Sequence, residues 1–484
     1  MPSALAPAHM PGGLVLINLK ERDVTDTQNA EIALAYVGGG SLNWTRVLMA
    51  DLVHDATIAG EVRLFDLDAA AAQRNADLGN SYSEAHGVKL RYVVAESLQA
   101  ALAGADVVVI SILPGSFDDM AHDLDLPAKA GILQSVGDTV GPGGFIRSMR
   151  AIPIMATIAE AIGKHSPNAY VCNLTNPMSV LTGTLYRVFP GIRAWGECHE
   201  VTKLRHLVAQ LANQRTGTDR FAYSDVEINV LGINHFTFAD KAFVGGRDWL
   251  PDYLAFAAEH AATGWRAEPI DQHNEEQRYF EDYNRVKFDL TTRLGIAAAA
   301  GDRHLAEFLP SNWYLANSAD WKFGLTPVDY RRRSRKATQE ADRLAVQGGT
   351  VPALPPASEE ALVPQLRALL RGETLVINAN LPNQGQLEGL PLGTIVETNA
   401  VFSGTGIRPV YAGRLPAAAE ALVRPHAERQ NALLSAVLAG DRGTLESLFL
   451  TDPLVAALGP QRGTELFGQM VTATSHQLPA ALRF

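Results

Sequence analysis

A cysteine and a histidine stand next to each other at Cys198 and His199, directly after an apolar run. Thiolate and imidazole are both good ligands for a divalent transition metal. A closed structural zinc site needs four such ligands. A metal that is bound by only a few protein ligands would instead keep vacant coordination positions, which substrate oxygens could occupy. The alternative, a buried cysteine beside a hydrogen-bonded surface histidine, stays open on these two residues alone.

Other polar residues with ligand or acid–base side chains stand at the ends of apolar runs or in glycine-rich turns. They are Ser111, Asp138, Asn173, Asn176, His235, Asp302, Arg303 and His304. Active sites of open α/β sheets lie beyond the carboxyl ends of the strands, where such residues would meet. Each also has a structural interpretation, such as a helix cap for Asp302 or a turn residue for Asp138. Cys172 lies inside an apolar run and is predicted to be a buried core residue.

Three consecutive glycines, Gly38, Gly39 and Gly40, follow the apolar run 32–37 and precede a helical pattern at 42–53. In that setting glycines let the backbone approach a pyrophosphate, and the helix N-terminus supplies amide donors. The third glycine position of the usual fingerprint is Asn43, so a tight turn of any α/β domain is the alternative.

Two polar residues near this turn favour the nucleotide interpretation. Ser41 can cap the helix that follows. Asp66 ends the next apolar run, where a carboxylate would accept hydrogen bonds from the ribose hydroxyls of NAD and disfavour the extra phosphate of NADP. The order of strand, turn, helix, strand and acid therefore predicts an NAD site.

Apolar runs alternate with helical patterns in the first half of the chain. The predicted strands are 32–37, 62–65, 105–112, 169–173 and 192–196, and a long helix is predicted at 142–164. Strands alternating with helices indicate a doubly wound parallel sheet. We predict an α/β fold with a Rossmann-like NAD-binding domain, of the lactate and malate dehydrogenase type, at residues 31–215. Residues 1–30 are predicted to be a tail.

The pattern changes after residue 215. Residues 226–244 alternate like an antiparallel ribbon, and helical stretches follow near 273–294, 328–346 and 413–441. Residues 348–356 and 381–391 have the glycine, proline and asparagine content of loops. We predict a mixed α+β domain at 216–484 for substrate binding and oligomer contacts.

Composition excludes several classes of protein. The chain has 484 residues with 41 basic and 52 acidic side chains, a net charge of −11, which argues against a nucleic-acid partner. No apolar run is long enough to predict a membrane span. Two cysteines exclude a disulfide scaffold and indicate a reducing compartment, so a cytoplasmic location is expected.

Four motifs, taken together and in this order, resemble glycoside hydrolase family 4 from about residue 32 to at least residue 399. They are Gly38-Gly39-Gly40-Ser41, Asn173-Leu174-Thr175-Asn176-Pro177, Cys198-His199-Glu200 and Gly232-Ile233-Asn234-His235. Residues 137–144 and 301–308 resemble the alpha-galacturonidase branch of that family. The resemblance implies an enzyme that holds NAD and a divalent metal, usually Mn²⁺, an exception to the two-carboxylate rule of glycoside hydrolysis.

The implied reaction contains redox steps that cancel over one turnover. The sugar is oxidised at C3 with NAD⁺ as the hydride acceptor, which acidifies the C2 proton. A base removes that proton, the C1 leaving group departs by elimination, water adds, and the hydride returns. The metal bridges the C2 and C3 oxygens and stabilises the charge that develops there.

The resemblance also implies roles for individual residues. Cys198 and His235 match metal ligands, and Asp302 matches the base that takes the C2 proton. Asp138 matches another active-site acid, as proton donor or partner of a metal-bound water. His199 is a candidate acid or additional metal contact, and the choice of general acid between these two stays open.

The remaining candidates bind the cofactor or the sugar. The residues predicted to bind NAD are Gly38, Gly39, Gly40, Ser41, Asp66, Ser111 and Asn173. The residues predicted to bind the sugar are Asn176, Arg147, Arg303 and His304. A C6 carboxylate favours a bidentate arginine. For Arg147, Arg150 and Arg303, a structural salt bridge is the alternative.

The predicted substrate is thus a small-molecule alpha-galacturonide. An alpha-glucuronide, a neutral alpha-galactoside or an alpha-glucoside stays open as an alternative, as does, from another class, an NAD-dependent hydroxy-acid dehydrogenase. The resemblance further suggests a homodimer or homotetramer.

Overall fold

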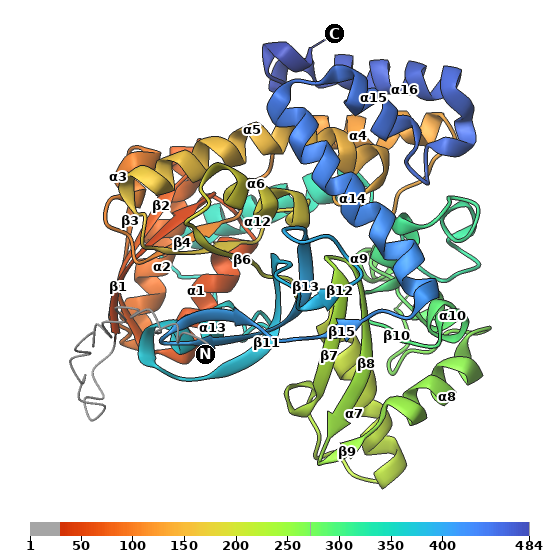
Figure 1. Ribbon diagram of the computed structural model, residues 1–484. Helices are drawn as coiled ribbons and strands as arrows, with labels where there is room; N and C mark the ends of the chain where they lie inside the picture. The colour runs from red at the N-terminus through yellow and green to blue at the C-terminus, as the bar shows by residue number, and fades with distance from the viewer. Residues whose placement is uncertain (1–29, 272, 484) are drawn as a thin grey trace, which may run out of the picture.

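One nine-stranded sheet is the centre of the computed structural model, which describes residues 30–271 and 273–483 (Figure 1). Six of its strands are parallel and lie in the order β6-β5-β4-β1-β2-β3. They are β1 Ala30–Val37, β2 Ile58–Phe65, β3 Leu90–Val94, β4 Val107–Ile110, β5 Tyr170–Asn173 and β6 Arg193–Gly196. This arrangement confirms the predicted doubly wound sheet. The edge strand β3 was not predicted, because five residues with one exposed arginine give too short an apolar pattern.

Alternate residues of each parallel strand face two different helix layers, as the two-residue period of a strand requires. Leu34 and Tyr36 of β1 pack with α1, α2 and α13 (Leu362–Arg371). Ala35 and Val37 pack with α5, α6 and α14 (Ala417–Ala439). Both faces are therefore buried, which explains the continuous apolar runs in the sequence. The helices in this half are α1 Trp44–Asp55, α2 Ala69–His86, α3 Leu98–Leu102, α4 Phe117–Lys129, α5 Gly141–His165, α6 Met178–Val188 and α7 Thr202–Thr216.

The second half of the chain continues the same sheet instead of building a separate one. Strand β11 (Leu375–Pro382) pairs antiparallel with β6 through Asn380 and Gly196. Strands β13 (Ile395–Ser403) and β14 (Gly406–Pro409) extend the sheet beyond β11. The two predicted regions therefore share one sheet, with parallel strands from the first and antiparallel strands from the second.

A hairpin of β7 (Glu227–Ile233) and β8 (Phe236–Val244) projects beside this sheet and confirms the predicted ribbon. The predicted helical stretch near 273–294 is divided, because Phe280 to Asn284 leave the helical path and Asn284 is left-handed at φ 59°. The predicted loop at 381–391 contains the end of β11 and a short strand. The other elements here are β9 Arg247–Asp248, α8 Leu250–His260, α9 Glu275–Tyr279, α10 Arg285–Leu294, β10 Ala297–Ala298, α11 Asp302–Leu305, α12 Val328–Gln347, α13 Leu362–Arg371, β12 Leu387–Glu388 and β15 Gly413–Arg414.

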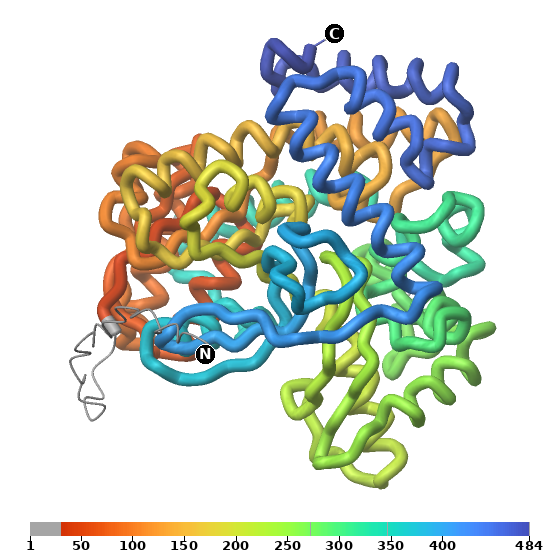
Figure 2. Tube along the Cα trace, in the orientation of Figure 1, coloured from red at the N-terminus to blue at the C-terminus, as the bar shows by residue number. Residues whose placement is uncertain are grey.

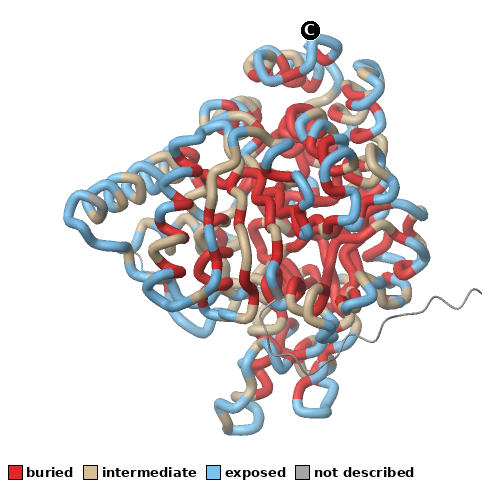
Figure 3. Tube along the Cα trace, turned by 90° about the vertical axis from the view of Figure 1, so that its left-hand side faces the viewer, coloured by how far each residue is buried: buried red, intermediate tan, exposed pale blue. Residues whose placement is uncertain are grey.

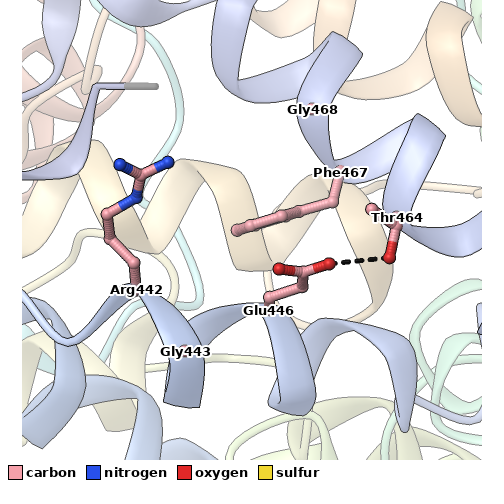
Figure 4. A pocket seen from close by; sticks show the side chains of 6 residues that line it. All are labelled: Arg442, Gly443, Glu446, Thr464, Phe467 and Gly468. Carbon is pink, nitrogen blue, oxygen red and sulfur yellow. Dashed lines mark hydrogen bonds between the residues drawn. The ribbon is translucent and has the colours of Figure 1, made fainter.

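The C-terminal helices cover the top of the molecule, where α14 crosses α5 and α6 (Figures 1 and 2). They are α14 Ala417–Ala439, α15 Arg442–Leu450 and α16 Gly459–Ala473. A hollow of ≈ 150 Å³ between α15 and α16 has the following lining (Figure 4): Arg442, Gly443, Glu446, Thr464, Phe467 and Gly468. None of these residues belongs to the predicted site.

Buried residues gather in the interior, and exposed residues cover the outer helices and loops (Figure 3). Cys172 is fully buried, as predicted. Among the described residues, no helix is long and apolar enough to cross a membrane. The predicted tail, apart from Ala30, lies outside the described residues.

Candidate active site

The three glycines form a turn that has no room for side chains. A Cβ at Gly38, whose φ is 100°, would lie 1.9 Å from the carbonyl oxygen of Ser111. At Gly39 it would lie 2.7 Å from the Cβ of Leu64, and at Gly40 2.7 Å from that of Ala71. Glycine is therefore required at all three positions, and the bare backbone of this turn fits the close approach of a pyrophosphate.

Polar side chains hold this turn from both sides. Asp66 accepts a hydrogen bond from the amide of Gly40 at 2.9 Å, so its carboxylate lies beside the turn at the end of β2. The Ser41 hydroxyl accepts from the amide of Trp44 at 3.2 Å and so caps the first turn of α1. Asn75, on α2, donates to the carbonyl oxygens of Gly39 (2.8 Å) and Ser41 (2.9 Å). Sequence reasoning missed Asn75, because a polar residue on a helix face carries no signal of its own.

Ser111 follows β4 and borders the glycine turn at Gly38, and Asn173 ends β5, the next strand of the sheet. Asn173 is fully buried and donates to the Thr175 carbonyl and the Thr182 hydroxyl, both at 3.2 Å. Its side chain therefore shapes the turn that carries Asn176.

Asp138, His235 and His304 converge from three elements far apart in the sequence. Their candidate ligand atoms all lie within 4.8 Å of one another. Asp138 precedes α5, His235 occupies the β7–β8 turn with a left-handed φ of 65°, and His304 lies on α11. The Thr139 hydroxyl contacts both Asp138 Oδ1 (2.7 Å) and His235 Nδ1 (2.8 Å).

This group has the donor chemistry of a divalent metal site. Nδ1 of His304 is buried and has no hydrogen-bond partner in the described part of the chain. Burial lowers the pKa of His235 and His304. Burial would raise the pKa of Asp138, but His304, His235 and Arg147 outweigh it and lower the pKa to about 2. An ionised carboxylate and two neutral imidazoles are the forms that bind a metal, so these residues fit one.

Cys198 lies beside this group and not within it. Its carbonyl oxygen accepts from Asn378 at 3.3 Å, and Glu397 accepts from both Asn378 (2.9 Å) and Asn234 (3.2 Å). Glu397, on β13, thus connects the Cys198 backbone to the turn that carries His235. Burial raises the pKa of the Cys198 thiol well above its usual range. A bound cation would be needed to deprotonate this thiol.

His199 and Glu200 point in different directions from the same turn. His199 Nδ1 lies 2.7 Å from Glu360, and its side chain is 41 % exposed, with its ring centre 6.0 Å from a ring centre of Trp44. Glu200 is buried, pairs with Lys203 at 2.9 Å, and accepts from the amide of Gly301 at 2.9 Å. Glu200 thereby ties the Cys198 turn to α11. The motif contained Glu200, but spacing alone could not reveal its partner a hundred residues away.

Asp302 is fully buried at the start of α11. Its two oxygens accept from the amides of Val286 (3.1 Å) and Lys287 (2.9 Å), so it also caps α10. Burial and the neighbouring Asp282 raise its pKa well above the usual value, whereas these amides lower it. The Lys287 ammonium group is buried nearby with no hydrogen-bond partner among residues 30–271 and 273–483.

Three of the predicted sugar-binding residues, Asn176, Arg147 and His304, lie near Asp138, whereas Arg303 is bonded to the segment that precedes it. Asn176 donates to Asp138 Oδ2 at 3.1 Å, and Arg147 donates to the Asn176 carbonyl at 3.0 Å. Arg303 donates to the carbonyls of Gly324 (3.1 Å) and Ser135 (3.0 Å), contacts Thr326, and lies over the Phe280 ring. Arg303 is thus held in the wall of the site by structural contacts.

Known proteins share this sequence and arrangement over nearly the whole chain. Residues 33–214 match the model for family 4 glycosyl hydrolases, and residues 230–455 match the family 4 glycosyl hydrolase C-terminal domain. An alpha-galacturonidase of Bacillus subtilis is 45 % identical over 442 residues, covering 91 % of this chain and 97 % of the relative. One of Thermoanaerobacterium saccharolyticum is 42 % identical over 459 residues, covering 94 % and 98 %. The chain belongs to glycoside hydrolase family 4.

Solved structures agree with this assignment. The crystal structure of the putative glucosidase lplD from Bacillus subtilis is 43 % identical, with a TM-score of 0.86 over 91 % of this chain and 99 % of that chain. A 6-phospho-alpha-glucosidase from gut microorganisms, in complex with NAD and Mn²⁺, shares the fold at 17 % identity, with a TM-score of 0.76 over 93 % and 99 %. This family 4 chain is therefore a glycosidase.

A further buried acid of this glycosidase, Glu307, was also missed by sequence reasoning. Its carboxylate accepts from the amides of Val136 (2.7 Å) and Gly137 (2.9 Å), and so holds the loop that carries Asp138. Glu307 follows His304 by three residues in the motif at 301–308. Its role depends on a contact across 170 positions, which the motif does not encode.

Proposed function

We propose that this family 4 glycosidase hydrolyses alpha-galacturonides with bound NAD and a divalent metal such as Mn²⁺. Four relatives with the name alpha-galacturonidase, at 41–45 % identity over more than nine-tenths of the chain, support the substrate class. The observation that carries the mechanism is the Asp138–His235–His304 group, which lies at the same edge of the sheet as the glycine turn. A hydroxy-acid dehydrogenase would give no reason for a metal-binding group at this place.

The residues divide the work between positioning and proton transfer. When bound, NAD⁺ supplies a hydride acceptor for C3 of the sugar, and the metal polarises the C2 and C3 oxygens. Asp138, His235 and His304, with Cys198 beside them, would hold the metal. Asn176 orients a sugar hydroxyl, and its own position is fixed by Asp138 and Arg147.

Two side chains remain for the proton transfers. Asp302 in its ionised form removes the C2 proton. The Lys287 ammonium group and the amides of Val286 and Lys287 favour that form, and the amides hold the carboxylate in one orientation. His199 donates the proton to the leaving group, because its side chain is 41 % exposed while Asp138 is engaged with Thr139 and Asn176. General acid–base catalysis requires such positioned donors and acceptors.

A panel of p-nitrophenyl glycosides tests the substrate class. The enzyme with NAD⁺, Mn²⁺ and a reductant should release p-nitrophenol fastest from the alpha-galacturonide. The alpha-glucuronide, alpha-galactoside and alpha-glucoside are the comparison substrates. Faster turnover of a neutral hexoside would overturn the uronide assignment, and stoichiometric NADH absorbing near 340 nm would indicate a dehydrogenase instead.

Isotope exchange tests the elimination. A substrate with deuterium at C2, turned over in ordinary water, should give a sugar with solvent hydrogen at C2. Full retention of the deuterium would contradict removal of the C2 proton. The Asp302→Asn variant should abolish both exchange and turnover while NAD still binds.

A further inference from the structure

Two arginines lie near Asp138, and a third donates to Ser135 in the segment that precedes it. Arg147 comes from α5, Arg303 from α11, and Arg331 from the first turn of α12. Thr326, just before α12, contacts the Arg303 guanidinium and donates its amide to Ser135 at 3.4 Å. The start of α12 is therefore fastened to the walls of the site that flank Asp138 and His304.

Electrostatic interactions link Arg331 to Asp138, to Arg147 and to Arg303. Burial lowers the pKa of Arg331, and Asp138 raises it. After burial, the charge of Arg331 is the largest influence that lowers the pKa of Arg303. Arg147 and Arg331 thus lie near Asp138, and Arg303 lies near Arg331.

Most nearby acids already have a cationic partner. Glu200 and Asp282, which lie near Arg303, both pair with Lys203. Asp123 is paired with Arg150, through two nitrogens at 2.9 and 2.5 Å. Burial raises the pKa of Glu307 to about 7, more than its amide contacts lower it, so its carboxylate is only partly ionised at neutral pH. Burying unbalanced cations is costly, so an anionic ligand would be stabilised here.

The three arginines differ in how far their donors are already used. Arg303 makes three contacts to the wall, and Arg147 donates to the carbonyl of Asn176. Arg331 Nε is buried, yet it has no hydrogen-bond partner in the described ranges. The next residue of α12, Arg332, instead donates hydrogen bonds to Asp118 and Asp329.

We propose that Arg331 binds the C6 carboxylate of the sugar and so sets the preference for a uronide over a neutral hexoside. This inference rests on the proposed function. The planar guanidinium can hold a carboxylate through two parallel hydrogen bonds, whereas a neutral hydroxymethyl group would leave the cation unbalanced. Arg331 is thus a specificity-determining residue, separate from the proton-transfer groups.

The test compares Arg331→Met with the matched control Arg332→Met, one position along the same helix. Both variants keep an unbranched apolar stem and should unfold at the wild-type temperature. Values of kcat/KM are measured on p-nitrophenyl alpha-galacturonide and alpha-galactoside with NAD⁺ and Mn²⁺. Calorimetry on the same loaded proteins measures the binding of galacturonate and of galactose.

Arg331→Met should lower kcat/KM on the galacturonide by about 30-fold or more, as loss of a buried charged partner does. The value on the galactoside should change by less than about threefold, since no charge is lost there. Galacturonate binding should weaken in parallel, and Arg332→Met should match the wild type. Equal losses on both substrates, or an unchanged ratio, would overturn the proposal.

The calorimetric arm separates this inference from the proposed function. If the wild type hydrolyses no alpha-galacturonide, the proposed function fails. Selective loss of galacturonate binding in Arg331→Met would still support the carboxylate site in that case. If the wild type binds galacturonate no better than galactose, the carboxylate site is wrong.

Discussion

His304 illustrates how much a single side chain contributes to the proposed metal site. It contributes the third ligand atom of the group with Asp138 and His235, and its ring lies 3.7 Å from that of His235. We expect His304→Gln to weaken Mn²⁺ binding by at least about 10-fold, because one imidazole donor is lost. Titration of the protein with Mn²⁺, followed by the electron paramagnetic resonance signal of the free ion, measures this affinity.

The control for that measurement is His206→Gln. His206 pairs with Glu359 on the surface, so its loss should leave Mn²⁺ binding unchanged. Cys198→Ser should also weaken binding if the thiol completes the metal site from beside the group. Wild-type affinity in His304→Gln would show that the metal is held without this histidine.

The sequence revealed the candidate site residues more readily than the residues that hold or surround them. Asp138, His235 and His304 stand in short motifs, so their types and order could be read directly. Asn75 and Arg331 could not be found, because each acts through a contact with a distant segment. Arg331 stands in an arginine-rich helix, and only the fold reveals that its Nε is buried without a hydrogen-bond partner among the described residues.

Helix α2 holds the glycine turn of the proposed NAD site through one residue, which allows a test within a single element. Asn75 holds the glycine turn by two hydrogen bonds, whereas Asn80, further along α2, bonds the backbone of Tyr92. We expect Asn75→Ala to raise the Kd for NAD by about 10-fold, because the loss of about 1.4 kcal/mol of positioning corresponds to that factor.

Asn80→Ala removes equivalent hydrogen bonds away from the turn and serves as the control. It should lower stability by about as much as Asn75→Ala and leave NAD affinity at the wild-type value. Fluorescence titration with NADH measures the affinity, and thermal unfolding measures stability. Equal NAD affinities in the two variants would contradict a specific role for Asn75.

The docking of α14 onto the short helical turn after α11 depends on a buried histidine. His426 Nε2 lies 2.7 Å from the carbonyl oxygen of Phe308, and burial lowers the pKa of His426 to about 4. The unfolded chain therefore binds a proton that the folded chain does not between about pH 4 and 6.5. The stability that comes from this group is present above pH 6.5 and is lost as the pH falls toward 4.

This linkage predicts a difference between wild type and His426→Gln. Lowering the pH from 7 to 5 should cost the wild type about 2 kcal/mol more than the variant, which cannot take up the proton. Urea unfolding at both pH values measures the two free energies of unfolding. An identical pH dependence in both proteins would show that His426 does not contribute.

Regular elements were predictable where the periodicity was long, and less so where a single residue ended an element. Five of the six parallel strands and α5 follow from their apolar runs, whereas β3 does not. The division between α9 and α10 depends on Asn284, and no apolar pattern predicts its left-handed conformation. The antiparallel strands β11 and β13 contain the buried polar residues Asn378, Asn380 and Glu397. They therefore lack the uniform apolar run of a central strand.

The shared sheet makes the two halves of the molecule one folding unit. Trp195 of β6 is fully buried against Phe402 of β13, with ring centres 5.6 Å apart. Its indole nitrogen donates to Gln365 of α13 at 2.7 Å. A fragment of residues 30–215 would expose this tryptophan and the unpaired edge of β6, and exposed apolar edges promote association.

We therefore expect the 30–215 fragment to aggregate, although it contains every strand of the predicted NAD domain. The intact chain should unfold in one calorimetric transition, because the core on each face of the sheet draws residues from both halves. Size-exclusion chromatography and NADH binding on the fragment check the first expectation. A monomeric fragment that binds NADH, or two separate transitions in the intact chain, would mean that the antiparallel strands add to a sheet that is already stable. Because the metal group draws His235 and His304 from the second half and Asp138 from the first, a single cooperative unit would also keep these ligands together up to the unfolding temperature.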